Sequence, residues 1–294
     1  GWIKVIIVRV TGGLGNQMFQ YAMYKSLEKK GKLVKLDSKS FYETKKEHNG
    51  YELERIFDIK PNKPTKEDLE KFDENNISTL FKIKRKLFGD KKFVYDTKEY
   101  VFNKDVYKLK NSYLNGYWQS IKYFEGIEND IKKDFRFKNQ LDNKNLEILN
   151  EIENSNSISI HIRRGDYMSP ENYNMYGCIA TPTYYKKAIK VIEEKVENPT
   201  FFVFSNDMDW VKKNIQINSR VFYIDINSGN GSYKDMQLMS NCKHNIIANS
   251  SFSWWGAWLN ENKNKIVIAP KKWINREDVD SNKIELFCEG WTLL

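Results

Sequence analysis

The stretch from Ser157 to Tyr167 carries the side chains best suited to hold an anion. Isoleucine alternates with polar residues up to Arg163, which is typical of a β-strand. At the strand end His161, Arg163 and Arg164 stand together, just before a glycine and Asp166. Adjacent guanidinium groups are costly to bury without a counter-charge, and arginine forms paired hydrogen bonds to phosphate. The pattern predicts a phosphate or diphosphate site, with Arg163 on the anion and an Arg164–Asp166 ion pair fixing the turn.

A glycine-rich loop, Thr11–Gln17, precedes an expected helix near the start of the chain. It follows part of a dinucleotide-binding fingerprint, but Met18 stands where a small residue is needed, and the Gly-Lys-Ser/Thr of a Walker loop is missing. Backbone N–H groups at Gly13 and Gly15, close to a helix start, favour anions. The loop ends in two amide side chains, the first at Asn16, which can donate to a sugar or a phosphate. A purely structural turn is the alternative.

The segment Phe201–Trp210 predicts a buried strand that ends in Ser-Asn-Asp. Asp207 and Asp209 repeat the Asp-x-Asp pattern that holds a divalent metal in many sugar-nucleotide transferases. Asp209, however, falls in the first turn of an expected helix, where aspartate is most often a cap. We therefore favour Asp207 as an acceptor for the N–H groups of a guanine edge, and metal binding is the alternative.

A serine-rich turn follows the expected strand Asn245–Ala248. Ser250, Ser251 and Ser253, with Phe252 among them, begin an aromatic helix whose backbone N–H groups would form an anion nest. Simple capping is the alternative and is compatible with phosphate binding. The tryptophans of this helix have helical spacing and are expected mostly in the core: Trp254, Trp255 and Trp258.

Strands and helices alternate along the chain, which indicates an α/β fold with parallel sheets. The expected strands are Ile3–Val10, Leu33–Asp37, Ser157–Arg163, Thr200–Ser205, Arg220–Asp225, Asn245–Ala248 and Lys265–Ala269. The expected helices are Gln17–Lys30, Pro182–Glu194, Met208–Asn214, Tyr233–Asn241 and Phe252–Leu259. The stretch Asn139–Asn156, rich in Asn, Glu and Lys, is the expected linker. We predict two Rossmann-like domains, residues 1–150 and 151–294, that face each other across a cleft.

Composition excludes several classes of protein. With 40% hydrophobic and 14% aromatic residues in 294, the chain can bury substantial cores, and its opening apolar run is too short to span a membrane. Three well-separated cysteines and three histidines fit a reducing compartment and argue against a zinc site. The net charge of +9 indicates a solvated Lys-rich surface, with attraction to an anionic membrane or a nucleotide as the alternative. We expect no nucleic-acid partner, because no known nucleic-acid-binding module is present.

Five motifs, in their order along the chain, resemble glycosyltransferase family 11, the bacterial and animal α-1,2-fucosyltransferases. They are the stretches Gly12–Ala22, Gly116–Ser120, His161–Tyr167, Phe204–Asp207 and Ser250–Trp258. The resemblance implies a GT-B-type fold, GDP-β-L-fucose as the donor and inversion at the anomeric carbon. It also implies that no metal or other cofactor is obligatory.

The same resemblance assigns roles to individual residues. Arg163, as the β-phosphate ligand, and Asn16, near the scissile bond, are the expected catalytic residues. The expected donor-binding residues are Gly13, Gly15, Asn16, His161, Arg163, Asp207, Ser250, Ser251, Phe252 and Ser253.

The resemblance implies that the acceptor is a terminal β-galactoside of an oligosaccharide, a lipopolysaccharide O-antigen or another glycan. An aromatic cluster, Tyr113–Tyr123, offers Tyr117, Trp118 and Gln119 as acceptor-binding candidates, with ordinary core packing as the alternative. A general base is not identified. The acidic residues considered for it, none of them preferred, are Asp37, Glu43 and Glu52.

A bacterial, cytoplasmic enzyme is expected, with peripheral contact at the anionic inner membrane as an open point and the oligomeric state undecided. Two other interpretations stay open. One is a metal-dependent GT-A transferase that uses Asp207 and Asp209. The other is a non-catalytic module that binds a nucleotide or a glycan.

Overall fold

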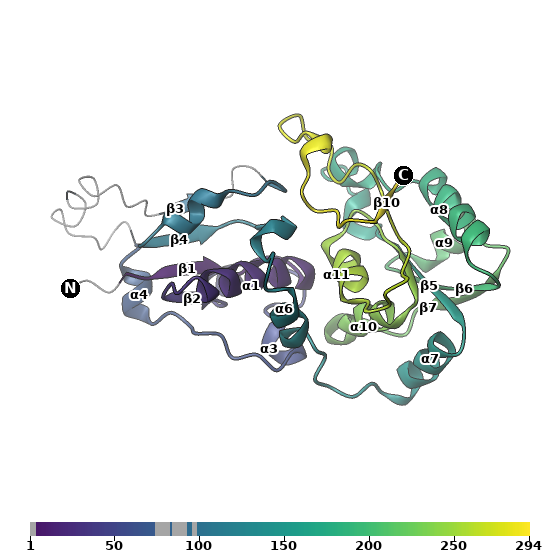
Figure 1. Cartoon of the computed structure of the whole chain (residues 1–294), viewed down its shortest axis with the longest axis horizontal. Helices are drawn as coiled ribbons and strands as arrows, with labels where there is room; N and C mark the ends of the chain where they lie inside the picture. Colours follow the sequence, from purple (N-terminus) through teal and green to yellow (C-terminus); the bar gives the residue numbers. More distant parts are fainter. Residues whose placement is uncertain (1–3, 74–82, 84–92, 96–98) are drawn as a thin grey trace. The chain divides into compact units, whose positions relative to one another are not determined.

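The computed structural model describes residues 4–73, 83, 93–95 and 99–294, and the chain divides into two compact units (Figure 1). Unit 1 contains the chain up to Lys138 together with Lys283–Leu286, and unit 2 contains Asn139–Asn282 and Phe287–Leu294. The division therefore falls at the start of the expected linker, whereas a boundary after residue 150 would cut through a helix, α7 (Asn143–Glu153).

Unit 1 is built on a parallel four-stranded sheet in the order β2-β1-β4-β3. Its strands are β1 (Ile6–Arg9), β2 (Val34–Asp37), β3 (Phe93–Tyr95) and β4 (Ser112–Asn115). Its α-helices are α1 (Leu14–Lys29), α2 (Ser40–Thr44), α3 (Leu53–Ile56), α4 (Lys66–Glu70) and α6 (Glu128–Asp134). Its described residues also form two 3₁₀ turns, Lys104–Lys108 and Ile121–Tyr123.

Helix α1 carries the glycine-rich loop at its start and runs beside the strands of the unit 1 sheet (Figure 1). It begins at Leu14, three residues before the predicted start at Gln17, because Gly13 takes the N-cap position. Gly31 has a φ of 74°, a left-handed conformation that glycine adopts without strain, and it ends the helix as predicted.

Unit 2 is built on a parallel six-stranded sheet in the order β10-β9-β8-β5-β6-β7. Its strands are β5 (Asn156–Ile162), β6 (Pro199–Ser205), β7 (Arg220–Ile224), β8 (His244–Ile246), β9 (Val267–Ala269) and β10 (Thr292–Leu293). Its α-helices are α7 (Asn143–Glu153), α8 (Pro182–Lys195), α9 (Met208–Asn214), α10 (Tyr233–Asn241) and α11 (Ser251–Leu259). Single turns of 3₁₀ or π-helix occur at Gly165–Met168, Tyr173–Gly177, Gly229–Gly231 and Ser281–Lys283.

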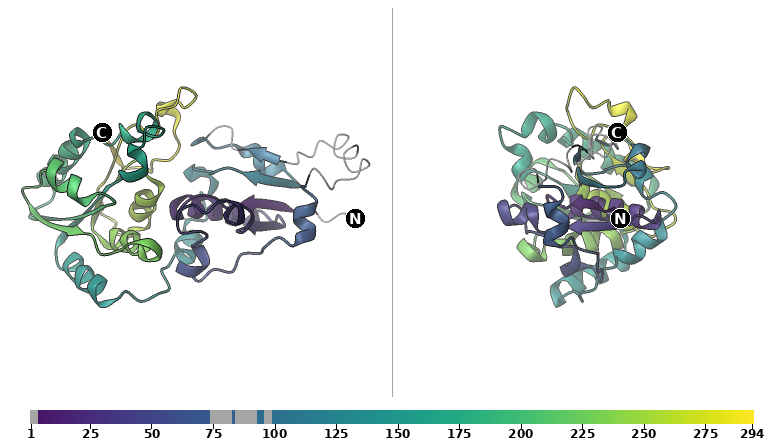
Figure 2. Two further views of the ribbon diagram at one scale, coloured as in Figure 1. Left: turned by 180° about the vertical axis from the view of Figure 1, so that it is seen from behind. Right: turned by 90° about the vertical axis from the view of Figure 1, so that its left-hand side faces the viewer.

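Helices cover both faces of the unit 2 sheet (Figure 2). The isoleucines of β5 pack with α8 and α9 on one face, and Phe202 and Phe204 of β6 pack with α7 and α10 on the other. The tryptophans of α11 are buried, as predicted. These two parallel-sheet units confirm the predicted α/β class. The expected linker, in contrast, forms helix α7, because Ile152 and its apolar neighbours pack into the unit 2 core.

The segment Lys283–Leu286 ties a late part of the chain to unit 1. Glu285 N–H donates to the Tyr100 carbonyl at 2.7 Å, and Ile121 N–H donates to the Glu285 carbonyl at 3.0 Å. The Glu285 carboxylate pairs with Lys122 Nζ at 2.5 Å.

Among the helices of the described residues, none is both long enough and apolar enough to cross a membrane.

Candidate active site

In unit 2 the polar residues singled out from the sequence gather at the carboxyl ends of two adjacent strands. Strands β5 and β6 are parallel, and their last residues, Ile162 and Ser205, are paired in register. The residues that follow, Arg163 and Arg164 on one side and Asp207 on the other, therefore lie at the same edge of the sheet. This edge is where open parallel sheets bind their ligands.

The arginines do not pair as predicted, since Arg163, expected to be free for an anion, takes the aspartate that was expected for Arg164. Arg163 pairs with Asp166 at 2.8 Å, and its guanidinium lies 5.6 Å from the centroid of the Tyr167 ring. Arg164 pairs with Asp207 at 3.2 Å and stacks 3.7 Å from the Trp210 ring centroid. The predicted Arg164–Asp166 pair is therefore wrong, because the parallel register brings Asp207 within reach of Arg164.

Asp207 has structural partners on both carboxylate oxygens. It is the N-cap of α9, where Oδ1 accepts a hydrogen bond from Trp210 N–H at 3.2 Å, while Oδ2 pairs with Arg164. Asp209 lies in the first turn of the same helix, as expected. Recognition of guanine by Asp207 stays a prediction. In the part of the chain that the structure describes, no three His, Cys, Asp or Glu side chains come together as a metal-binding group.

His161 is buried and neutral. Burial, reinforced by the charge of Arg163, lowers the pKa of its imidazole to about 3. The ring packs 5.7 Å from the Phe252 ring, and its Nδ1 is buried without a hydrogen-bond partner among the described residues. A buried unsatisfied nitrogen is uncommon and marks a position that a ligand can satisfy. Contact between His161 and a nucleotide therefore stays a prediction, which the unpartnered Nδ1 supports.

The serine-rich turn begins a nine-residue helix, α11, whose N-cap Ser250 makes no side-chain capping hydrogen bond. Simple side-chain capping by Ser250, the alternative to phosphate binding, is therefore not observed. Ser251 and Phe252 are half-buried at the helix start, and buried Ser253 Oγ reaches back to the Ser250 carbonyl at 3.5 Å. Because β8 is parallel to β5, this helix start belongs to the same sheet edge as Arg163.

The glycine-rich loop of unit 1 is held from inside by Gln17. Its amide donates to the carbonyls of Gly12 at 3.0 Å and Gly50 at 2.8 Å and accepts from Glu52 N–H at 2.9 Å. Gln17 is fully buried, so the idea that its amide serves a ligand is wrong. Asn16 is half-buried and accepts a hydrogen bond from Gln119 Nε2 at 2.8 Å.

Beside this loop, unit 1 has a pocket of about 420 Å³ at the carboxyl ends of β1 and β4. Arg9 closes β1, Thr11, Gly12 and Asn16 come from the loop, and Tyr117 follows β4. The pocket is thus formed by the same kind of sheet edge that gathers the arginines in unit 2.

The three acceptor-binding candidates differ in how exposed their side chains are. Tyr117 lines this pocket and is 38% exposed. Trp118 is 1% exposed and Gln119 5% exposed, so a sugar cannot stack on the one or reach the other without local opening. For these two residues the burial favours the alternative, ordinary core packing, and an acceptor contact stays a prediction.

None of the acidic residues considered as a base lines the pocket. Asp37 is buried and accepts hydrogen bonds from Tyr113 Oη at 2.6 Å and from two backbone N–H groups. Glu52 is buried and paired with Arg55 at 2.6 Å, and Glu43 is exposed elsewhere. The acids that do line the pocket are Glu47 and Glu99, which the sequence analysis missed because no strand end or motif marks them.

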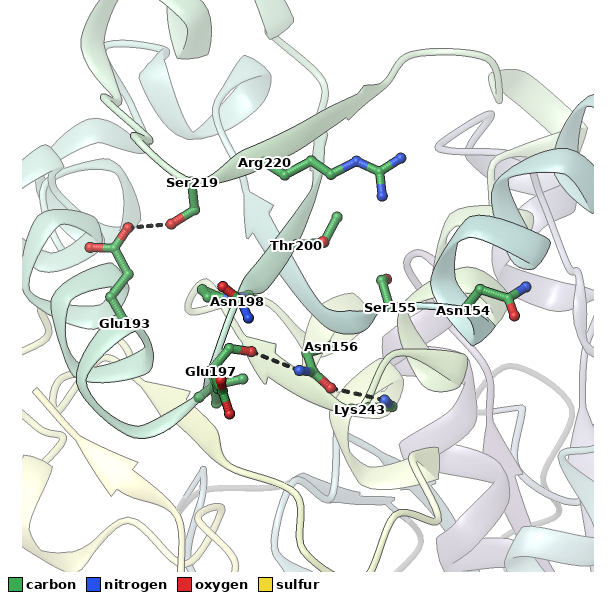
Figure 3. Close-up of a pocket in the computed structure, with 12 residues that line it drawn as sticks. Asn154, Ser155, Asn156, Glu193, Glu197, Asn198, Thr200, Ser219, Arg220 and Lys243 are labelled. Carbon is green, nitrogen blue, oxygen red and sulfur yellow. Dashed lines mark hydrogen bonds between the residues drawn. The ribbon is translucent and has the colours of Figure 1, made fainter.

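A second pocket, of about 750 Å³, lies at the opposite, amino edge of the unit 2 sheet (Figure 3). Its polar side chains are engaged with one another: Ser219 donates to Glu193 at 2.7 Å, and Asn156 bridges the Glu197 carbonyl and Lys243. It contains none of the residues predicted for the site, so we do not assign catalysis to it.

Comparison with known proteins matches these features to one family. Residues 3–294 match glycosyl transferase family 11. An α-1,2-colitosyltransferase of Escherichia coli is 36% identical over 95% of this chain and 96% of its own length. A galactoside α-(1,2)-fucosyltransferase 1 of Saimiri boliviensis boliviensis is 26% identical over 50% of this chain and 42% of its own.

Among solved structures, the NodZ α-1,6-fucosyltransferase co-crystallised with GDP superposes with a TM-score of 0.51 at 11% identity. It covers 87% of this chain and 92% of its own. This likeness concerns the fold, which is of the GT-B type, so the GT-A alternative is wrong. The match over nearly the whole length shows that the chain is a glycosyltransferase and belongs to glycosyltransferase family 11.

Proposed function

We propose that the protein is an inverting α-1,2-fucosyltransferase that moves L-fucose from GDP-β-L-fucose to the 2-OH of a terminal β-galactoside. The acceptor would be part of an oligosaccharide, a lipopolysaccharide O-antigen or another glycan. The observation that carries the proposal is Arg163 at the carboxyl edge of the unit 2 sheet, in a chain that matches family 11 over nearly its full length.

The chemistry fits the residues at that edge. Breaking the bond between fucose and phosphate produces a sugar with oxocarbenium character and a nucleoside diphosphate with added negative charge. Arg163 and the N-terminus of α11 would stabilise this departing charge, and His161 would contact the nucleotide as a neutral ring. Asp207 is proposed to contact guanine, and Asn16, with Gly13 and Gly15 beside it, to lie near the scissile bond.

A colitosyl donor is the second candidate, because the E. coli relative that is 36% identical is named for that sugar. Colitose is L-fucose without the 3-hydroxyl group, so the two donors differ by one polar contact. A site that hydrogen-bonds a substrate hydroxyl discriminates strongly against a donor that lacks it.

The test offers GDP-fucose and GDP-colitose, each with lactose, N-acetyllactosamine and lacto-N-biose, and determines the product linkage by NMR. We expect an α-1,2-linked fucosyl product with at least one acceptor. Faster transfer from GDP-colitose would assign the second candidate instead, and a linkage other than α-1,2 would contradict the proposal.

Metal independence is part of the proposal. It is supported by the pairing of Asp207 with the cationic Arg164 side chain and by the position of Asp209 in the first turn of α9. We expect full activity in excess EDTA. Activity that disappears with EDTA and returns with Mn²⁺ or Mg²⁺ would contradict it.

We further propose a cytoplasmic enzyme in peripheral contact with an anionic membrane, supported by the net charge of +9. Co-sedimentation with vesicles that contain anionic lipid should then occur at low salt and decrease at high salt. Equal binding to neutral vesicles would contradict an electrostatic contact.

A further inference from the structure

We propose that Glu99 is the general base that takes the proton from the acceptor hydroxyl, in the 420 Å³ pocket of unit 1. The inference rests on the proposed function, because it concerns the acceptor side of the same reaction. It is argued from the position, burial and neighbours of the residues that line this pocket.

The pocket is suited to a polar, hydroxylated ligand. Tyr117 offers an exposed aromatic ring, and the amides of Asn16 and Asn115 stand beside it. In its wall, Arg9 lies 5.5 Å from the Phe41 ring centroid, and its buried Nε has no hydrogen-bond partner among the described residues. A buried donor without a partner is a place where a ligand oxygen gains a hydrogen bond.

Two carboxylates reach the same region of the pocket. After burial itself, the negative charges of Glu99 and Glu47, in that order, raise the pKa of Tyr117. Both carboxylates line the same pocket as Tyr117, and both act electrostatically on its hydroxyl group. Arg9, Lys45 and His48 also line the pocket. The positive charges of Arg9 and Lys45 balance the negative charges of the two acids.

Glu99 is the better fixed of the two acids. It is half-buried, whereas Glu47 is exposed in a loop. The next residue, Tyr100, is buried with a φ of 65°, and its carbonyl accepts a hydrogen bond from Glu285 N–H at 2.7 Å. A base must be held within hydrogen-bond reach of the proton that it removes, which favours the anchored residue.

The step balances as a proton transfer coupled to a substitution. The acceptor O–H bond breaks, its proton goes to the Glu99 carboxylate, and the oxygen forms a bond to the anomeric carbon of the donor sugar. The bond from that carbon to the phosphate oxygen breaks, and its electron pair leaves with the nucleoside diphosphate. Glu99 then releases the proton to solvent.

The experiment compares Glu99→Gln in the whole chain with the control Glu43→Gln, an exposed acid that does not line the pocket, and with Glu47→Gln, the rival acid that does. General base catalysis contributes about 10²- to 10⁴-fold in rate. We expect Glu99→Gln to lower kcat for transfer at least 100-fold while the acceptor KM changes less than threefold. Glu43→Gln should keep kcat within threefold, Glu47→Gln should lose much less kcat than Glu99→Gln does, and GDP affinity measured by calorimetry should be the same in all four proteins. A fourth variant, Glu99→Asp, keeps a carboxylate and should recover part of the rate and the acid limb of the pH profile.

Each outcome decides the assignment. Full-rate transfer by Glu99→Gln, or a loss confined to Glu47→Gln, overturns it, and so does a Glu99→Gln defect that appears only in KM. If Glu99→Gln does not fold, Glu99→Ala takes its place, and full-rate transfer by that variant overturns the assignment as well. Wild-type protein that binds GDP but transfers fucose to none of the galactosides contradicts the proposed function instead.

Discussion

Replacing Arg163 by alanine removes one guanidinium from the carboxyl edge of the unit 2 sheet and little else. Its side chain is 29% exposed and that of its partner Asp166 is 49% exposed. An ion pair this open to solvent contributes about 0–1 kcal/mol to the free energy of unfolding. For a chain of this size we therefore expect the melting temperature to fall by no more than about 4 °C.

The effect on activity should be much larger than the effect on stability. Loss of one preorganised contact to a developing negative charge typically lowers kcat by about 10²- to 10³-fold. Loss of a hydrogen bond to a charged group costs about 1.5–3 kcal/mol, which corresponds to about 10- to 100-fold weaker binding of GDP. Arg163→Lys keeps the charge but not the paired geometry, and it should recover only part of this loss.

The assay measures fucosyl transfer to a β-galactoside, GDP binding by calorimetry and thermal unfolding, all on the same preparations. Asp166→Asn is the matched control, since it breaks the same ion pair and keeps Arg163, and it should lose less than about tenfold in kcat. Turnover of Arg163→Ala close to that of the wild type would refute the assignment of the phosphate site. An equal loss in Asp166→Asn would show that turn geometry, and not the guanidinium, is what matters.

Two further predictions concern the same unit. Gly165 has a φ of 45°, and a Cβ there would lie 2.3 Å from Asn206 Nδ2, so Gly165→Ala should destabilise the fold by about 1–3 kcal/mol in urea unfolding. Gly231→Ala, whose Cβ meets no atom within 4 Å, should change stability by less than about 0.5 kcal/mol, and equal effects would contradict the argument. Burial raises the pKa of Asp235 to about 7, so the folded chain holds this proton more tightly than the unfolded chain does, and stability is lost as pH rises from about 4 to about 7. Asp235→Asn should therefore be more stable than the wild type at pH 8 and about equal to it at pH 4, and a pH-independent difference would contradict the buried acid.

Much of the fold could be predicted from local sequence patterns. The bounds of α9 and α10 agree with the expected ranges, because capping and apolar periodicity are properties of consecutive residues. The end of β6 at Ser205 agrees with the prediction, and β5 ends at Ile162, one residue before its predicted end. Helix α7 was missed because its composition is that of a linker, and only packing against the unit 2 core shows that it is a helix.

The site was less predictable than the fold, for a reason that the arginines illustrate. Arg164 is two residues from Asp166, and sequence distance alone favours that pair. Parallel pairing of β5 with β6 brings Asp207 to Arg164 from 43 positions away, and the Trp210 ring adds a second contact. Glu99 was missed for the same reason, because only the tertiary fold brings it beside the glycine-rich loop and Tyr117.

The pH dependence of turnover can be predicted from the titratable side chains of the two units. His161 is neutral above pH about 3, and guanidinium groups do not titrate, so neither His161 nor the two arginines supply an acid limb between pH 4 and 8. Burial raises the pKa of Tyr117 above its ordinary value, so this side chain supplies no acid limb either. An acid limb in kcat/KM that reports the acceptor base is expected to come from the unit 1 pocket, where Glu99, Glu47 and His48 are the candidate bases. If Glu99 is the base, the limb should survive in His48→Asn and in Glu47→Gln and disappear in Glu99→Gln. A limb that disappears in His48→Asn would transfer the role of base to that histidine.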